Sequence, residues 1–181
     1  MLIPQFVSAG LLPVGTYRVT FGELRQSHLV TGLENGDDWD NNWRGHLVTN
    51  AEILVNQLWE LGISEIFLDG SFVEAKPYPN DIDGYFECDA KEFASGNVAQ
   101  RLNALDPHKV WTWSAASRRP AQGSMKRQLP MWHRYRVELY PHFPGLLSGI
   151  TDAAGNELQF PSAFRQQRGT GLPKGIVQIV R

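Results

Sequence analysis

The stretch EIFLDGS at residues 65–71, followed after nine residues by DID at residues 81–83, decides the fold that this sequence predicts. The apolar residues in and beside each stretch predict a short buried strand. Between them, the segment KPYPN at residues 76–80 holds two prolines and is typical of a loop. Because strand side chains alternate with a period of two, we expect Asp81 and Asp83 on the same face of the second strand, with Cα atoms about 6.5 Å apart.

The turn and the two aspartates are residue types that suit phosphate and metal chemistry. Gly70 lets the chain turn with its backbone N–H groups uncovered, and Ser71 adds a hydroxyl, so the turn can cradle a phosphate. Asp81 and Asp83 can hold one or two Mg²⁺ ions, because Mg²⁺ prefers oxygen ligands and is usually shared with substrate phosphates. The alternative is a polar turn between two core strands. Lys76, in the following loop, is either a further triphosphate contact or a solvent-facing side chain.

A third carboxylate is expected from the segment 134–140, in which apolar and charged residues alternate. This alternation predicts a strand with Arg134, Arg136 and Glu138 on its polar face. Glu138 is therefore the candidate that would complete a metal site with the two aspartates. The alternative is that Glu138 pairs with one of these two arginines on a solvated face.

The Gly-Ser pair, the nine-residue spacer and the DID triplet resemble the signature of the polymerase-beta-like nucleotidyltransferase superfamily. The resemblance implies an α/β (α+β) fold with a mixed β-sheet and helices mainly on one side. It implies a Mg²⁺-dependent transfer of a nucleoside monophosphate from an NTP to a hydroxyl, with Asp81, Asp83 and Glu138 as catalytic and metal-binding residues. Glu138 would also help to deprotonate the attacking hydroxyl. The superfamily more often has Asp at this position, and Glu reaches one methylene further.

A second resemblance covers nearly the whole chain. The segments LPVGTYRVT at residues 12–20 and PKGIV at residues 173–177 resemble the opening and closing segments of small bacterial and phage nucleotidyltransferase-like proteins. This resemblance favours a single domain over residues 1–181 with an N-terminal arm at 1–25. The resemblance to the nucleotidyltransferase superfamily, whose small stand-alone enzymes often modify RNA, proteins or small molecules, implies such an acceptor. It also implies a toxin–antitoxin or phage-defence setting with a cognate toxin or antitoxin as partner.

The segment between His108 and Val137 carries seven Lys or Arg residues and no Asp or Glu, in a chain whose net charge is −2. Tryptophan and tyrosine side chains are interleaved with these cations, and a positive surface with aromatic rings suits phosphates and stacked bases. The alternative is a solvated loop whose arginines pair with the acidic region at 34–40. The candidates for nucleic-acid or phosphate binding are Arg118, Arg119, Lys126, Arg127, Arg134 and Arg136.

Length and composition predict one cytoplasmic domain. The chain has 181 residues, of which 42% are hydrophobic and 20% charged, as is ordinary for a globular protein. It has no apolar run long enough for a membrane span and no signal-peptide pattern, so we expect no membrane partner. The single cysteine, Cys88, excludes an internal disulfide and a cysteine-based zinc site. The five histidines share no metal-ligand spacing.

Hydrophobic patterns predict four further elements, namely a helix at 46–62, a helix at 89–105, and strands at 109–113 and 175–180. Asp89 is a suitable N-cap for the second helix, and Gly96 weakens it. The glycine-rich stretch at 169–175 resembles a phosphate loop only superficially, because no Ser or Thr follows its lysine. A hairpin turn is expected there instead.

Three classes of function remain open from the sequence. The first is the Mg²⁺-dependent nucleotidyltransferase. The second is a catalytically inactive binding partner, such as an antitoxin or a nucleotide- or nucleic-acid-binding module, which would keep the phosphate cradle and the basic surface. The third is a metal-dependent phosphohydrolase or nuclease, against which the spacing of the Gly-Ser pair argues.

Overall fold

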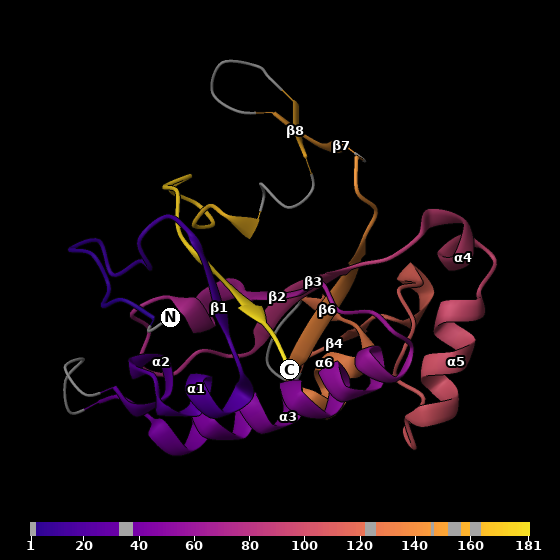
Figure 1. The fold of residues 1–181 in the computed structure, drawn as a ribbon, viewed down its shortest axis with the longest axis horizontal. Coiled ribbons are helices and arrows are strands. Elements are labelled where there is room, and N and C mark those ends of the chain that lie inside the picture. Colours follow the sequence, from indigo (N-terminus) through magenta and orange to yellow (C-terminus); the bar gives the residue numbers. More distant parts are fainter. Residues whose placement is uncertain (1–2, 33–37, 122–125, 146, 152–156, 160–163) are drawn as a thin grey trace.

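The computed structural model describes residues 3–32, 38–121, 126–145, 147–151, 157–159 and 164–181. Its central element is a five-stranded mixed sheet with the strand order β1-β9-β2-β3-β6 (Figure 1). The strands are β1 (Thr16–Val19), β2 (Ile66–Asp69), β3 (Ile82–Glu87), β6 (Val137–His142) and β9 (Ile176–Ile179). The pairs β1–β9 and β3–β6 are parallel, whereas β2 is antiparallel to both β3 and β9.

Helices lie mainly on one side of this sheet. They are α1 (Phe21–Gln26), α2 (His28–Thr31), α3 (Asn41–Glu60), α4 (Ala90–Ala94), α5 (Asn97–Leu105) and α6 (Pro130–Tyr135). Figure 1 places α1, α2, α3 and α6 below the sheet and the hairpin of β7 (Leu147–Thr151) and β8 (Glu157–Gln159) above it. The predicted mixed sheet with helices mainly on one side is confirmed. Among the described residues, no helix combines the length and the apolar character that crossing a bilayer requires.

The long helix α3 covers the sheet along most of its width (Figure 1). Asp40 caps it by accepting a hydrogen bond from the backbone N–H of Trp43 at 2.8 Å, so the helix starts before the predicted His46. The sequence predicted an apolar face for this helix because its apolar residues recur with the helical period. This face is buried, with Leu47, Ala51, Leu54 and Leu58 all fully inaccessible.

Residues 130–142 form a helix followed by a strand, so the predicted strand at 134–140 is wrong in its first half. Pro130 occupies the first turn of α6, where the missing N–H of proline has no helical partner to lose. The helix ends at Tyr135 and is capped by Arg136, whose φ is 55°, and β6 begins at Val137. Arg134 and Arg136 therefore do not share a strand face with Glu138.

Residues 109–113 form no strand, although Trp111 is fully buried. The Asn103 side chain satisfies both backbone groups of Trp111, accepting from its N–H at 2.9 Å and donating to its carbonyl at 2.8 Å. Because both groups are used, Trp111 cannot join a sheet ladder. The predicted helix at 89–105 is two helices, because Gly96 adopts a left-handed conformation with a φ of 83° between α4 and α5.

The N-terminal arm predicted at 1–25 contains regular secondary structure. It contributes the edge strand β1 and most of α1, which follows a capping box. The segments at 12–20 and 173–177 pack together, since the backbone N–H of Gly175 donates to the Leu12 carbonyl at 3.0 Å. A Cβ at position 175 would lie 2.3 Å from the Pro13 carbonyl oxygen, so this contact requires glycine. The strand expected at 175–180 is confirmed as β9.

Candidate functional site

Three acidic residues lie side by side across three neighbouring strands. Asp69 at the end of β2 is the antiparallel partner of Asp83 in β3, and Asp83 is the parallel partner of Glu138 in β6. Paired residues face the same side of a sheet and neighbouring strands lie about 4.8 Å apart, so these three side chains form a row. Asp81 directly precedes β3, and both Asp81 and Asp83 line the same cleft. The expectation that the two aspartates share a face agrees with this placement.

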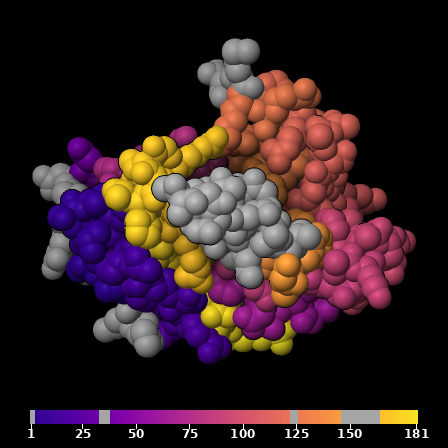
Figure 2. Space-filling view, turned by 90° about the horizontal axis from the view of Figure 1, so that it is seen from above, coloured from indigo at the N-terminus to yellow at the C-terminus, as the bar shows by residue number. Residues whose placement is uncertain are grey.

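Asp69, Asp81 and Asp83 form the floor of a cleft of about 1040 Å³. One wall comes from residues 126–136 and the other from residues 164–174. In Figure 2 the molecule is hollowed between the C-terminal segment, in yellow, and the segment that includes the first of these walls, in coral. Pockets for small molecules typically measure about 300–1,000 Å³, so the cleft has room for a ligand of nucleotide size.

The predicted turn at Gly70 and Ser71 lies against this floor. It begins a short 3₁₀ helix, η1 (Gly70–Val73), and Gly70 has a φ of 74°. A Cβ at position 70 would lie 2.7 Å from the Asp83 carboxylate, so only glycine allows the turn to approach Asp83 this closely. Ser71 and Lys76 also line the cleft. The structure therefore brings five predicted site residues together in this cleft, namely Gly70, Ser71, Lys76, Asp81 and Asp83.

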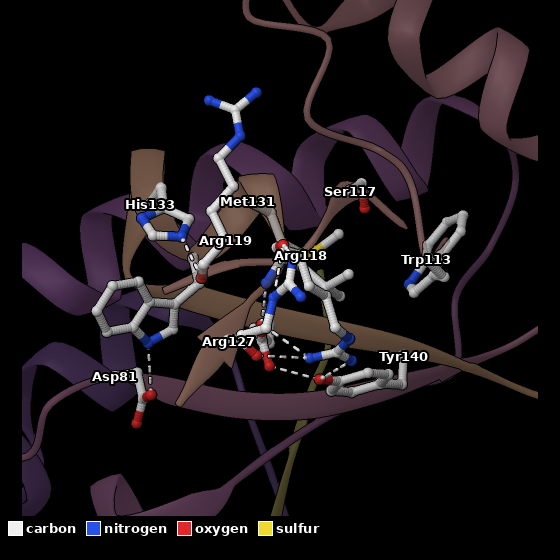
Figure 3. Close-up of polar contacts among 12 residues, drawn as sticks. Asp81, Trp113, Ser117, Arg118, Arg119, Arg127, Met131, His133 and Tyr140 are labelled. Atoms are coloured by element: carbon white, nitrogen blue, oxygen red, sulfur yellow. Dashed lines mark hydrogen bonds and ion pairs between the residues drawn. The ribbon is translucent and has the colours of Figure 1, made fainter. Parts of the chain in front are cut away.

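Glu138 is buried, with 3% of its surface exposed. Its Oε1 accepts a hydrogen bond from the backbone N–H of Leu129 at 2.7 Å, and its Oε2 accepts one from the Tyr140 hydroxyl. The Arg118 guanidinium lies 4.0 Å from Oε1 and donates to the Tyr140 hydroxyl at 3.2 Å (Figure 3). The alternative reading of Glu138, paired on a solvated face with an arginine of its own strand, is therefore wrong.

Crowding of negative charge sets the electrostatics of the floor. Burial, together with the negative charges of Asp81 and Glu138, raises the pKa of Asp83 to about 7. Burial also raises the pKa of Asp69 to about 6, although the Lys174 ammonium group opposes this shift. Asp81 has a direct partner, because the indole Nε1–H of Trp132 donates to its Oδ2 at 2.6 Å (Figure 3). The floor thus carries more negative charge than its protein neighbours neutralise.

Sequence reasoning missed Lys174, which is buried beneath the turn. Its ammonium group donates to the Gly70 carbonyl at 2.9 Å and to Glu74 Oε1 at 2.7 Å, and it lies 3.2 Å from Asp69 Oδ1. The hairpin turn expected at 169–175 is confirmed by the hydrogen bond from Gln167 N–H to the Leu172 carbonyl at 2.8 Å. No local pattern identifies Lys174 or Trp132, because their partners lie far away in the chain.

The basic segment divides into side chains held within the protein and side chains that face the cleft. It is not only loop, because β4 (Arg119–Pro120) and β5 (Arg127–Gln128) form a short hairpin. Arg118 donates to the Arg127 carbonyl at 3.2 Å, and Arg127 donates back to the Arg118 carbonyl at 2.8 Å. Figure 3 shows the Arg119 side chain directed away from this network. Lys126 and Arg136 line the cleft.

The pairing of this segment with the acidic region at 34–40 finds no support in the described part of the chain. Residues 33–37 lie outside the described residues. Asp38 and Asp40 form no ion pair with the described arginines of the segment. Instead, the Arg134 guanidinium lies 5.6 Å from the centre of the neighbouring Tyr135 ring.

Residues 4–180 match the model of a family of unknown function (DUF6932). The chain belongs to this family. No curated protein and no solved structure matches it. Because the match extends over all the strands of the central sheet, the DUF6932 family model covers the whole carboxylate floor and both walls of the cleft.

In this DUF6932 protein, the described residues contain no group of three or more His, Cys, Asp or Glu side chains arranged to hold a metal ion. Both oxygens of Glu138 are engaged by Leu129 and Tyr140, so the predicted third ligand is held by other donors. Asp81 and Asp83 are the predicted ligands that line the cleft.

Proposed function

We propose that this protein is a Mg²⁺-dependent nucleotidyltransferase that transfers a nucleoside monophosphate from an NTP to a hydroxyl of an RNA, protein or small-molecule acceptor. One observation carries the proposal. Asp81 and Asp83 lie on the floor of a cleft of nucleotide size, and the Gly70–Ser71 turn lies against Asp83. This juxtaposition supports the resemblance of Gly70–Ser71 and the triplet at 81–83 to the polymerase-beta-like signature.

The residues of the floor fit a divalent cation. Their donors are all carboxylate oxygens, which Mg²⁺ prefers. The raised pKa of Asp83 follows from burial and from uncompensated negative neighbours, which a cation held by Asp81 and Asp83 would neutralise. Bound Mg²⁺ would supply Lewis-acid stabilisation of the charge that develops on the phosphate oxygens.

The side chains around the floor have separate tasks in this proposal. The Gly70–Ser71 turn would hold the triphosphate through backbone N–H groups and the Ser71 hydroxyl, with Lys76 as a further contact. The acceptor oxygen would form a bond to the α-phosphorus while the bond from that phosphorus to the pyrophosphate oxygen breaks. Glu138 would take the proton of the acceptor hydroxyl, and pyrophosphate would leave.

A second candidate function is a nucleotide- or nucleic-acid-binding partner without catalysis, such as an antitoxin in a toxin–antitoxin or phage-defence complex. One observation favours it. Both carboxylate oxygens of Glu138 accept hydrogen bonds from protein donors. The described residues contain no group of three or more His, Cys, Asp or Glu side chains arranged to hold a metal ion. Such a protein would keep the cleft and its basic wall.

Incubation with NTPs labelled at the α-phosphate, in the presence of total RNA and cell lysate, tests the proposal. An enzyme attaches label to an acceptor when Mg²⁺ is present and fails to do so with a chelator. Asp83→Asn should reduce the transfer on the order of 10²-fold or more, because it withdraws several kcal/mol of metal stabilisation. Asp89→Asn is the matched control, since it lies beyond the far end of β3 and Asn caps a helix as well as Asp. Transfer that is equal in wild type and Asp83→Asn would refute the proposal.

A further inference from the structure

Arg136 is held in an unusual conformation at the cleft wall. Its φ of 55° lies in the left-handed region, which residues other than glycine and asparagine rarely adopt. Its guanidinium carbon lies 3.9 Å from the centre of the Trp132 ring. Trp132 is in turn fixed by its hydrogen bond to Asp81. Strained backbone of this kind concentrates at functional sites, and here it presents a planar cation beside a carboxylate of the floor.

The side-chain hydrogen-bond donors of Arg136 have no partner among the described residues. In the described part of the chain its side chain makes no hydrogen bond and no ion pair, and its only contact of these kinds is the ring of Trp132. Two other cations near the floor already have protein partners, because Lys174 has three oxygen partners and Arg118 is bound to Tyr140. Arg136 therefore offers a guanidinium group, with five N–H donors in a fixed fork, to a ligand in the cleft.

The position of Arg136 separates it from the Gly70–Ser71 turn. Strand β3 lies between β2 and β6, the turn follows β2, and Arg136 directly precedes β6. The carbonyl of Arg136 accepts a hydrogen bond from the Ile82 N–H at 3.0 Å, which holds Arg136 next to Asp81. Two anion-binding features thus flank the carboxylates of β3, one on each side.

We propose that Arg136 binds a phosphate group of the acceptor, on the β6 side of the carboxylates. This inference rests on the proposed function, in which the turn on the β2 side holds the triphosphate of the NTP. A guanidinium fork matches two oxygens of a phosphate, and a cation stacked on an aromatic ring is already oriented for such a contact. The acceptor is then a phosphate ester with a hydroxyl near its phosphate, such as a sugar phosphate or the end of an oligonucleotide.

The test measures binding of two phosphate esters, ribose 5-phosphate and a single-stranded hexauridylate, by calorimetry with Mg²⁺ and saturating inorganic tripolyphosphate. Tripolyphosphate binding is measured separately. The variant is Arg136→Asn, because asparagine tolerates the left-handed backbone and should leave the fold intact. Arg101→Asn is the matched control, since this exposed arginine lies in α5 and is not among the residues that line the cleft. Thermal unfolding of each variant confirms that it is folded.

We expect Arg136→Asn to weaken ester binding by roughly tenfold to a hundredfold, the range for hydrogen bonds to a charged group, and to leave tripolyphosphate binding unchanged. Arg101→Asn should change neither. Binding of both esters indicates a small acceptor or a terminus, and binding of hexauridylate alone indicates an oligonucleotide. The inference is overturned if Arg136→Asn weakens tripolyphosphate binding, if it changes nothing, or if the wild type binds neither ester. A wild type that binds the esters but not tripolyphosphate contradicts the proposed function alone.

Discussion

The ammonium group of Lys174 lies 2.9 Å from the carbonyl oxygen of Gly70, although the two residues are 104 positions apart in the chain. A peptide carbonyl and the following N–H point in opposite directions, so this bond directs the Ser71 N–H away from Lys174. The same ammonium group donates to Glu74 Oε1 and forms an ion pair with Asp69. The C-terminal segment thus fixes the orientation of the turn that the proposed function assigns to phosphate binding.

Lys174→Met should therefore destabilise the protein strongly. It leaves two acidic side chains without their cation, and breaking a buried ion pair typically costs about 3–5 kcal/mol. Lys76→Met is the matched control, because Lys76 lines the same cleft but is exposed. Urea unfolding measures both, and the double variant Lys174→Met with Glu74→Gln should recover part of the loss. A Lys174→Met protein within about 1 kcal/mol of wild type would contradict this role of the ion pair.

Gly70→Ala tests the contact between the turn and Asp83. Gly70 and Gly62 both have a positive φ, at 74° and 81°, so an alanine at either position bears similar backbone strain of about 1–2 kcal/mol. A Cβ at position 62 meets nothing within 4 Å, whereas a Cβ at position 70 would lie 2.7 Å from the Asp83 carboxylate. Gly62→Ala is therefore a control for strain alone.

We expect Gly70→Ala to lose more stability than Gly62→Ala. Calorimetry should also show a loss of tripolyphosphate binding in Mg²⁺ of roughly tenfold or more for Gly70→Ala, since about 1.4 kcal/mol corresponds to tenfold in affinity. Gly62→Ala should bind like the wild type. Equal binding by the two variants would mean that the turn does not take part in phosphate binding.

The raised pKa of Asp83 predicts how stability without metal depends on pH. In the unfolded chain this carboxyl loses its proton near its ordinary pKa of 3.8, whereas the folded protein retains the proton up to about pH 7. The folded state binds more protons between these values, so the free energy of unfolding falls as pH rises from about 4 to 7. The raised pKa of Asp69, about 6, acts in the same direction.

Asp83→Asn removes the larger of these two contributions. In a chelating buffer the variant should be more stable than wild type at pH 8 by roughly 1–3 kcal/mol, and the difference should shrink at pH 5. Adding Mg²⁺ at pH 8 should stabilise the wild type and not the variant. Urea unfolding at the two pH values measures this, and a difference that does not grow with pH would contradict the assigned protonation.

The parts of the fold that the sequence predicts correctly are those specified by local patterns. The stretch at 65–71 and the triplet at 81–83 combine an apolar strand with a turn or an acid pair, and both form as expected. The alternation of apolar and charged residues at 134–140 was misleading. The end of a helix and its left-handed cap residue here carry the same alternating pattern as a strand. Trp111 is buried outside any strand because the Asn103 side chain forms hydrogen bonds with its backbone N–H and carbonyl groups. The hydrophobic periodicity of the sequence does not reveal such a contact.

The candidate site divides in the same way. Gly70, Ser71, Asp81 and Asp83 are adjacent in two short segments, and the cleft brings them together. Trp132, Lys174 and the partners of Glu138 reach the floor through tertiary contacts that span up to 104 positions. A single sequence holds no signal for such pairs, because their spacing follows from the order of strands in the sheet.

The hydrogen bond from Tyr140 to Glu138 separates the enzyme from the binding partner. Tyr140→Phe removes the hydrogen bond to Glu138 Oε2. If Glu138 completes the metal site, this change should tighten Mg²⁺ binding by roughly twofold to tenfold, which corresponds to the free energy of one hydrogen bond. Glu138→Gln should instead weaken Mg²⁺ binding, because it removes the charge of the third ligand. Tyr78→Phe is the control, since Tyr78 is an exposed tyrosine that stacks on Trp43.

Calorimetric titration with Mg²⁺ measures all three variants against the wild type, and label transfer from NTP is measured in parallel. Tighter binding in Tyr140→Phe together with weaker binding and lost transfer in Glu138→Gln would place Glu138 at the metal during turnover. Unchanged Mg²⁺ binding in both variants would instead mean that Glu138 serves only to hold Leu129, Tyr140 and Arg118 in position. The third carboxylate would then be missing from the metal site, and the binding partner would become the better account of this cleft.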